Sequence, residues 1–246
     1  ENVEDIRIFG PTNPNLLKNI SGADAAEFTV KNNCPFTIWP ATLTGSGGPA
    51  STTGFELASG ASPTVKIQPP WSGRLWARTG CTTGDDGKFT CATADCGSGQ
   101  VACNNAGGVP PASLVELFLA PNNGQDFYDI SLVDGFNLPV VLTPRGGSGG
   151  CEATGCPANI NGACPAPLQM KNPKGDVIGC KSACVVFNTP QFCCSGEFGT
   201  PEKCPPTEYS RAFKTQCPQA YSYAYDDKTS TFTCNGGPNY DVTFCP

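Results

Sequence analysis

The stretch that decides the fold is residues 87–103, which read Gly87-Lys-Phe-Thr-Cys91-Ala-Thr-Ala-Asp95-Cys96-Gly-Ser-Gly-Gln-Val-Ala-Cys103. Its three cysteines are separated by residues that favour turns. Gly87 and Gly97 permit tight turns, and Asp95 can accept hydrogen bonds from backbone amides where no sheet supplies partners. The stretch therefore predicts a compact disulfide knot.

Cysteine usage in the whole chain supports this interpretation. The 246 residues include 16 cysteines and no histidine. An even number at this density indicates disulfides formed in an oxidising compartment. Structural zinc is the alternative, but zinc sites use close chelating pairs, and the chain contains no Cys-x-x-Cys pair. We therefore expect every cysteine to be bridged.

The missing histidine limits the chemistry that the chain can perform. It excludes Ser-His-Asp and Cys-His catalysis and imidazole metal sites. With the cysteines bridged, any acid–base chemistry must use carboxylates. We expect no metal and no cofactor.

Net charge and hydropathy exclude further classes of protein. The chain has 21 acidic and 15 basic residues and a net charge of −6. Nucleic acids and anionic membranes need a basic surface, so neither is expected as a partner. No apolar run is long enough for a transmembrane segment. The 29 glycines and 24 prolines supply too many turns for a helical protein.

Short apolar runs bounded by turn residues predict a mainly β protein, either a sandwich or a barrel. The strand candidates are Phe28–Val30, Phe36–Trp39, Gly54–Leu57, Thr64–Ile67, Arg74–Arg78, Leu114–Leu119, Phe127–Leu132, Val140–Thr143, Thr231–Cys234 and Asp241–Phe244. Two further segments, Lys181–Phe187 and Thr207–Thr215, repeat apolar residues at helical spacing. Ser182 and Thr207 are suitable N-cap residues for these two helices.

These patterns divide the chain into a core, two lobes and an extension. Residues 1–26 contain no cysteine and form an extension of unknown role, in which Asn19 begins a glycosylation sequon. Residues 79–110 form a small disulfide lobe, and residues 157–217 form a helical disulfide lobe that is stapled because it cannot bury enough core alone. The core then consists of residues 27–78, 111–156 and 218–246.

The knot at 87–103 resembles the signature of thaumatin-like proteins, with its Thr-Ala-Asp-Cys centre intact. The other matching motifs are Asn32-Asn33-Cys34-Pro35, Trp76-Ala-Arg-Thr-Gly80-Cys81, Asp129-Ile-Ser-Leu-Val-Asp134-Gly-Phe-Asn137, Tyr221-Ser-Tyr-Ala-Tyr-Asp226-Asp227 and Thr243-Phe-Cys-Pro246. The resemblance covers residues 27–246 and all sixteen cysteines. It implies a thaumatin-like flattened antiparallel β-sandwich with two disulfide-rich lobes, one bearing short helices, and a cleft beside the helical lobe.

The resemblance also implies a disulfide pairing, which spacing alone does not determine. The implied bridges are Cys34–Cys245, Cys81–Cys91, Cys96–Cys103, Cys151–Cys234, Cys156–Cys217, Cys164–Cys180, Cys184–Cys193 and Cys194–Cys204.

An acidic site in the cleft is implied in the same way. Its catalytic residues are Glu116 as the acid and Asp134 as the partner. Its substrate-binding residues are Arg74, Asp129, Asp226 and Phe136, with Asp227 as the other candidate for the position of Asp226. Any one of these acids taken alone is more often solvated or structural.

Two arguments from the residues bear on this site. Glycoside hydrolysis needs one protonated carboxyl group and one carboxylate, and crowded acids beside an arginine can provide both. Asp129 and Asp134 are an odd number of residues apart, so they line one groove only if the strand ends or bulges between them. Asp134-Gly135 is a turn signal that permits this. Aromatic residues in the same motifs suit the C–H faces of sugars, although many of them are expected in the core.

The implied function is that of a secreted, extracellular antifungal defence protein, with the vacuole as the alternative location. Its implied partner is β-1,3-glucan of the fungal cell wall, and weak endo-β-1,3-glucanase activity is one possibility. The alternatives are a glucan-binding or membrane-perturbing protein without catalysis, and an inhibitor of foreign hydrolases. We expect a monomer.

Overall fold

The structure is a computed structural model and describes residues 24–246. The predictions made for the extension before residue 24, including glycosylation of Asn19, lie outside the described residues. Ala26, the last residue assigned to that extension, already belongs to the first strand.

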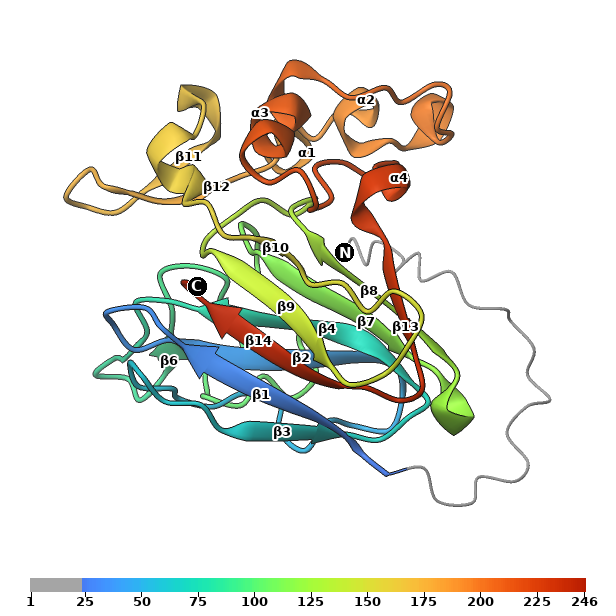
Figure 1. The fold of residues 1–246 in the computed structure, drawn as a ribbon. Helices are drawn as coiled ribbons and strands as arrows, with labels where there is room; N and C mark the ends of the chain where they lie inside the picture. Colours follow the sequence, from blue (N-terminus) through green and yellow to red (C-terminus); the bar gives the residue numbers. More distant parts are fainter. Residues whose placement is uncertain (1–23) are drawn as a thin grey trace.

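Two five-stranded sheets pack face to face (Figure 1). The first sheet consists, in spatial order, of β10 (Thr154–Cys156), β9 (Val140–Arg145), β14 (Asn239–Phe244), β1 (Ala26–Asn32) and β3 (Thr64–Ile67). The second consists of β13 (Phe232–Asn235), β8 (Gln125–Ser131), β7 (Leu114–Leu119), β4 (Trp71–Arg78) and β2 (Trp39–Gly47). Strands β1, β8 and β14 alternate buried and more exposed residues, as half-buried strands do.

The core lies between the two sheets. Phe28 and Val30 of β1 contribute fully buried side chains from the first sheet, and Val115 and Ile130 contribute from the second. Trp71 is also buried in this core. This packed core holds the two sheets together and fixes the positions of the side chains on their outer faces.

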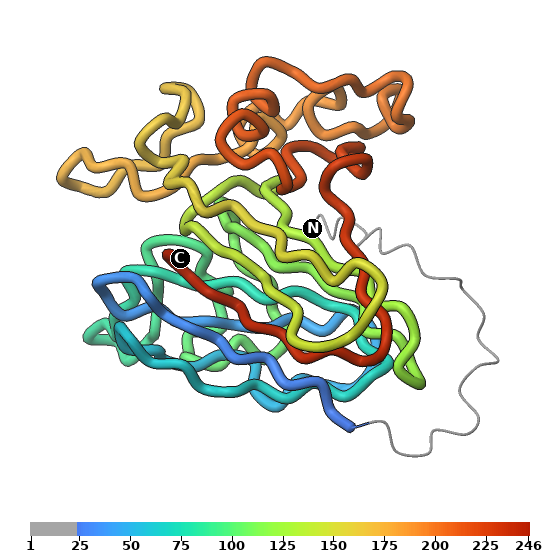
Figure 2. The backbone as a smooth tube through the Cα atoms, in the orientation of Figure 1, coloured from blue at the N-terminus to red at the C-terminus, as the bar shows by residue number. Residues whose placement is uncertain are grey.

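The first and last strands of the sandwich are neighbours. β1 pairs with β14 in parallel, whereas every other pair of strands in the described chain is antiparallel. Figure 2 shows the first strand, in blue, running beside the last, in red, in this sheet. Cys34 and Cys245 are bridged next to the paired strands, across a sequence separation of 211 residues. Closing so long a loop stabilises the fold by about 5 kcal/mol in the chain-entropy model.

The helices lie mostly above the sandwich, in the orange part of Figure 1. The α-helices are α1 (Ala183–Phe187), α2 (Pro190–Cys193), α3 (Glu208–Gln216) and α4 (Asp227–Ser230). The remaining short elements are β5 (Thr82–Thr83), β6 (Phe89–Thr90), β11 (Gln169–Lys171), β12 (Val177–Cys180) and the 3-10 turns η1 (Pro121–Asn123), η2 (Ile160–Ala163), η3 (Ala166–Leu168) and η4 (Gly196–Phe198).

All eight bridges implied by the family resemblance are present. The prediction of a mainly antiparallel β-sandwich with short helices is confirmed, apart from the parallel β1–β14 pair. Both predicted N-caps are also confirmed: the Ser182 hydroxyl accepts a hydrogen bond from the Val185 amide, and Thr207 accepts one from the Ser210 amide. The predicted strand Gly54–Leu57 forms only isolated bridges.

Candidate functional site

Three neighbouring strands align three charged side chains. In the sheet register Arg74 of β4 lies opposite Glu116 of β7, and Glu116 lies opposite Asp129 of β8. Residues directly opposite one another on adjacent strands share a face of the sheet, so these side chains form a line across it. We call Arg74, Glu116 and Asp129 the acidic row.

Asp134 joins the acidic row because β8 ends before it. The strand stops at Ser131, and a turn closed by the Gly135 amide donating to the Leu132 carbonyl at 2.8 Å reverses the chain. Gly135 has a φ of 95°, and a Cβ there would lie 2.5 Å from the Cys180 carbonyl, so the turn needs glycine. An Asp134 carboxylate oxygen then lies 3.7 Å from an Arg74 Nη. The strand break expected from the spacing of Asp129 and Asp134 is present.

The acidic row and Asp134 lie in a cleft with a volume of about 1040 Å³. The helical lobe supplies the opposite wall through α1, α2 and α3, and residues 221–227 close one side. The aromatic side chains that line the cleft are Phe192, Tyr209, Phe213, Tyr221, Tyr223 and Tyr225. The cleft thus combines carboxyl groups with aromatic rings.

Desolvation dominates the electrostatics of the cleft. Burial raises the pKa of Glu116 to about 7, the Arg74 charge opposes this shift, and the Asp134 charge adds to it. Burial also raises the pKa of Asp129 well above its usual range, and the charges of Glu116 and Asp227 add to the effect. For Asp134, burial raises the pKa and Arg74 opposes it. Burial in the cleft therefore favours the protonated forms of all three carboxyl groups relative to exposed ones.

Two buried polar atoms of the acidic row are unsatisfied. Arg74 Nε and Asp129 Oδ1 have no hydrogen-bond partner among the described residues. Buried polar atoms are nearly always hydrogen-bonded in folded proteins, so such atoms need an explanation. Neither atom is reached by solvent, so each is a desolvation cost that the fold leaves uncompensated at this site.

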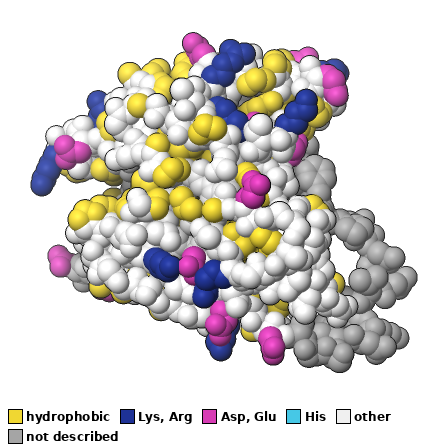
Figure 3. All heavy atoms as spheres, viewed as in Figure 1, with side chains coloured by type: hydrophobic (Ala, Val, Ile, Leu, Met, Phe, Trp, Pro, Cys, Tyr) yellow, Lys and Arg dark blue, Asp and Glu magenta, His cyan; other side chains and the backbone are white. Residues whose placement is uncertain are grey.

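An acid elsewhere among the described residues is paired with two cations. On the outer face of the first sheet, Asp241 lies 2.7 Å from Lys31 Nζ and 2.7 Å from Arg145 Nε. Figure 3 shows acidic and basic side chains side by side over this sheet. The cleft is different because a single arginine, Arg74, lies among the carboxyl groups of Glu116, Asp129 and Asp134.

The structure brings four of the six predicted site residues together: Arg74, Glu116, Asp129 and Asp134 all line the cleft. Asp226 is not among the lining residues; its carboxylate pairs with Lys214 at 2.9 Å, while Asp227 lines the cleft.

Phe136 corrects the sequence-based prediction. Its side chain is fully buried in the core, and its backbone is bonded to Cys180 in both directions at 2.7 and 2.8 Å. The turn at Gly135 directs the ring inward, so Phe136 has no surface to offer a ligand. Phe192 and Tyr209 line the cleft but were not predicted as site residues. The helical spacing at Tyr209 indicated only that it belongs to a packed helix.

Two further features are absent from residues 24–246. This part of the chain has no group of three or more acidic, cysteine or histidine side chains arranged to hold a metal ion. None of its helices is long and apolar enough to cross a bilayer.

Comparisons with known proteins agree with the geometry. The sequence model of the thaumatin family matches residues 32–246. Thaumatin-like protein 1 of Pyrus pyrifolia is 64% identical over 232 residues, which is 94% of this chain and 95% of that protein. A protein of Prunus avium named glucan endo-1,3-beta-glucosidase is 60% identical over 231 residues, 94% of each chain.

A solved structure shares the fold at low identity. It is a laminaripentaose-producing β-1,3-glucanase in complex with laminaritetraose, with a TM-score of 0.62 and 14% identity over 92% of this chain and 99% of that chain. The family match and the two close relatives span nearly the whole chain after its extension. The chain belongs to the thaumatin family.

Proposed function

We propose that this protein is a secreted defence protein that binds β-1,3-glucan of fungal walls in the acidic cleft and hydrolyses it slowly. The observation that carries the proposal is the acidic row, in which Arg74, Glu116 and Asp129 face one cleft in register. The eight disulfides support secretion, because such bridges persist in oxidising compartments.

The lining of the cleft suits a neutral sugar chain. Sugars present apolar C–H faces to aromatic rings and hydroxyl groups to carboxylates and guanidinium groups. The rings of Phe192, Tyr209 and Tyr223 offer the first kind of contact. The charged side chains of Arg74, Glu116 and Asp134, which line the cleft, offer the second. The relative from Prunus avium, named as a glucan endo-1,3-beta-glucosidase, supports β-1,3-glucan as the sugar.

Slow hydrolysis needs an acid and a base, and we assign these roles to Glu116 and Asp134. With a pKa raised to about 7, Glu116 keeps a proton at mildly acidic pH and can donate it to the glycosidic oxygen. As the C–O bond breaks, the Asp134 carboxylate accepts a proton from the attacking water. The two new chain ends thus receive the hydrogen and the hydroxyl of one water molecule.

One observation favours binding without hydrolysis as the second candidate. Burial raises the pKa of Asp134 and of Asp129 as well as that of Glu116. When several carboxyl groups hold protons, fewer ionised bases are available to activate water. Such a cleft would bind a neutral sugar chain well and cleave it poorly.

Laminarin separates the two candidates. Reducing ends released by the wild-type protein, Glu116→Gln and Glu56→Gln are measured beside the affinity for a laminari-oligosaccharide by calorimetry. Glu56 is exposed on the sandwich and does not line the cleft, so it is the matched control. We expect Glu116→Gln to lower the hydrolysis rate by about a hundredfold, the usual share of a general acid, while Glu56→Gln changes nothing.

Two results would contradict parts of the proposal. Equal, nonzero hydrolysis by the wild type and Glu116→Gln would remove Glu116 as the acid. No heat of binding for the oligosaccharide with any of the three proteins would remove glucan as the ligand.

A further inference from the structure

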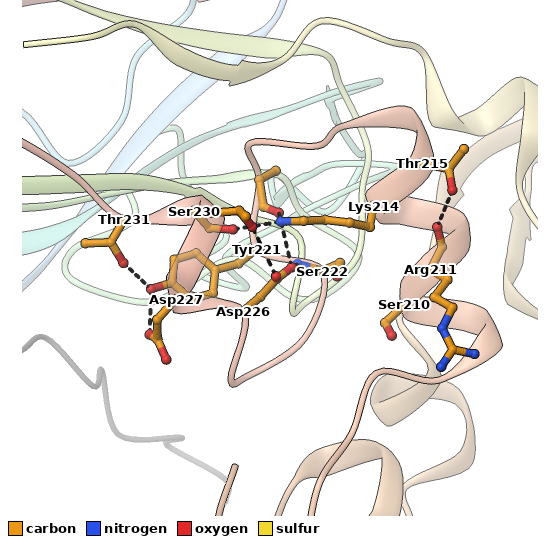
Figure 4. A network of polar contacts seen from close by, with 12 residues as sticks. Ser210, Arg211, Lys214, Thr215, Tyr221, Ser222, Asp226, Asp227, Ser230 and Thr231 are labelled. Atoms are coloured by element: carbon orange, nitrogen blue, oxygen red, sulfur yellow. Dashed lines mark hydrogen bonds and ion pairs between the residues drawn. The ribbon is translucent and has the colours of Figure 1, made fainter. Parts of the chain in front are cut away.

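Two adjacent aspartates have opposite environments in the wall of the cleft (Figure 4). Asp226 is satisfied from within the protein. Its Oδ2 accepts from the Ser222 amide at 3.0 Å, from the Ser222 hydroxyl at 2.8 Å and from Lys214 Nζ at 2.9 Å. Its side chain is only 13% exposed, which leaves little room for a ligand.

Lys214 connects three parts of the chain. Its Nζ lies 2.9 Å from Asp226 Oδ2, 3.0 Å from the Ala220 carbonyl and 2.9 Å from the Ser230 hydroxyl. An ammonium group has three N–H donors, so all of them are used. One cation on α3 therefore holds residues 220–227, which we call the wall segment, and the end of α4.

Asp227 points the other way. It is exposed, it lines the cleft, and its Oδ1 accepts a hydrogen bond from the Tyr221 hydroxyl at 2.8 Å. The Tyr221 hydroxyl also lies 2.6 Å from Thr231 Oγ1. Figure 4 draws Tyr221, Asp227 and Thr231 as one group, separate from the contacts of Lys214.

Tyr221 connects the wall segment to the acidic row. Its amide donates to the Ile130 carbonyl at 2.8 Å, and its carbonyl accepts from the Leu132 amide at 2.8 Å. These bonds bracket the end of β8, the strand that carries Asp129. The charge of Asp227 contributes to the electrostatics of Asp129 across this junction.

We infer that Lys214 and Asp226 are positioning residues, a latch that holds the wall segment so that Tyr221 and Asp227 stand beside Asp129. Neither residue of the latch touches a ligand. Asp226, matched to the cleft by sequence motif, acts through Lys214, and Asp227 supplies the carboxylate that faces the cleft. As far as it concerns glucan affinity, this inference rests on the proposed function.

The hydrogen bonds that Asp226 already accepts explain why it does not bind a ligand. For a sugar hydroxyl to bind Asp226 Oδ2, it would have to displace Ser222 or Lys214 from a largely buried carboxylate, leaving the displaced donor without a partner. The other oxygen, Oδ1, already lies 3.4 Å from the Thr229 hydroxyl. Charge-assisted hydrogen bonds of this kind are stronger than neutral ones. Asp227 has a single donor partner and an exposed carboxylate, so it can accept from a ligand at no such cost.

The first test needs no glucan. Carboxyl ¹³C NMR follows the titration of Asp129 in the wild type, Lys214→Met, Asp226→Asn and Arg211→Met. Glu116 and Asp227 both raise the pKa of Asp129, after the larger effect of burial. Releasing the wall segment lets Asp227 move away and lets water in, so both latch variants lower the Asp129 pKa. Arg211 is exposed on the same helix, and Figure 4 shows it turned away from the latch, so Arg211→Met leaves the titration unchanged.

The second test measures affinity for laminarihexaose by calorimetry. We expect Lys214→Met and Asp226→Asn each to weaken binding by about tenfold, because small displacements of positioned groups have effects of that order or larger. The double variant weakens binding no further than either single change, since both remove one latch. Lys214→Arg keeps a cation at the latch and restores part of the affinity.

The outcomes separate this inference from the proposed function. Additive losses in the double variant would show that Asp226 contacts the sugar directly and would overturn the inference. An unchanged Asp129 titration in both latch variants would overturn it as well. If the wild type binds no laminarihexaose but the latch variants shift the Asp129 titration, the latch stands and the glucan proposal fails. Amide exchange at Ser222, measured in variants that keep the wild-type melting temperature, distinguishes local release from failure to fold.

Discussion

Strand β8 carries an aspartate on each of its faces, and the two differ in their hydrogen bonding. On the core face Asp126 is 3% exposed and accepts from the Ala120 amide at 2.8 Å and from the Tyr240 hydroxyl at 2.7 Å. On the cleft face Asp129 leaves its Oδ1 buried and unsatisfied. A buried carboxyl group whose oxygens are both hydrogen-bonded stabilises the fold, whereas one held with an unpaired buried oxygen lowers stability.

The largest expected effect comes from removing the core carboxyl group. Asp126→Ala should lower the free energy of unfolding by about 3 kcal/mol, because it leaves a buried amide and the buried Tyr240 hydroxyl without an acceptor. Asp129→Ala, on the other face of the strand, is the matched control and should cost less than about 1 kcal/mol. Urea unfolding of both variants measures the difference. Equal losses would mean that the two faces of β8 do not differ in the way described.

The raised pKa of Glu116, on the cleft side of the second sheet, should make the free energy of unfolding depend on pH. The pKa of Glu116 rises from 4.5 to about 7 on folding, mainly through burial. Between these values the native state keeps a proton that the unfolded chain releases, so stability falls as pH rises through this window. At pH 8 the variant Glu116→Gln should therefore be more stable than the wild type by about 1 to 2 kcal/mol. The full conversion of the shift is larger, but the cleft is open to water.

Unfolding at a series of pH values measures this slope. Asp129 and Asp134 also have raised pKa values, so part of the slope should remain in Glu116→Gln. A variant that loses stability at pH 8 would show that the Glu116 carboxylate is well accommodated, contrary to the electrostatics described for the cleft. The same variant tests the glucanase proposal. A gain in stability together with a loss of hydrolysis would show that the Glu116 carboxyl group lowers stability and serves catalysis.

A smaller effect is expected from one of the two donors to Asp126. Tyr240→Phe keeps the aromatic ring that stacks on Phe28 at 5.1 Å but removes the hydroxyl group. The free energy of unfolding should fall by about 1 to 1.5 kcal/mol, the upper part of the range for a single ordinary hydrogen bond. Tyr223→Phe, whose ring lines the cleft, should change it by less than about 0.5 kcal/mol. A larger loss of stability in Tyr223→Phe would show that the Tyr223 hydroxyl makes a stabilising hydrogen bond, which we do not expect.

Some parts of the fold can be predicted from the sequence and others cannot. A short apolar run interrupted only by Glu116 predicts the strand Leu114–Leu119 to the residue, because its inward positions must be apolar to pack between the sheets. The parallel pairing of β1 with β14 joins residues about two hundred positions apart, and no local pattern encodes it. The resemblance to the family supplied the disulfides and the acidic row, which periodicity alone could not.

The failures of prediction at the site have physical causes. Phe136 lies in the same motif as the acids, but a glycine turn directs its ring into the core. Asp226 and Asp227 are equivalent as sequence, and only the position of Lys214 on another helix decides which of them is neutralised. The cleft-facing rings of Phe192 and Tyr209 come from the stapled lobe, whose position depends on tertiary packing.

The smallest effect on stability should come from Asp134, and its effect on chemistry should be larger. Its ion pair with Arg74 is 3.7 Å long, and both side chains are partly exposed, so Asp134→Asn should change the free energy of unfolding by less than about 0.5 kcal/mol. The Asp134 charge, however, contributes to the raised pKa of Glu116, and removing it leaves Arg74 free to stabilise the Glu116 carboxylate. The pKa of Glu116, followed by carboxyl ¹³C NMR, should therefore fall below about 7 in this variant. A Glu116 pKa that stays the same or rises would mean that the two carboxyl groups are electrostatically independent, and the acid and base of the proposed hydrolysis would then not act as a pair.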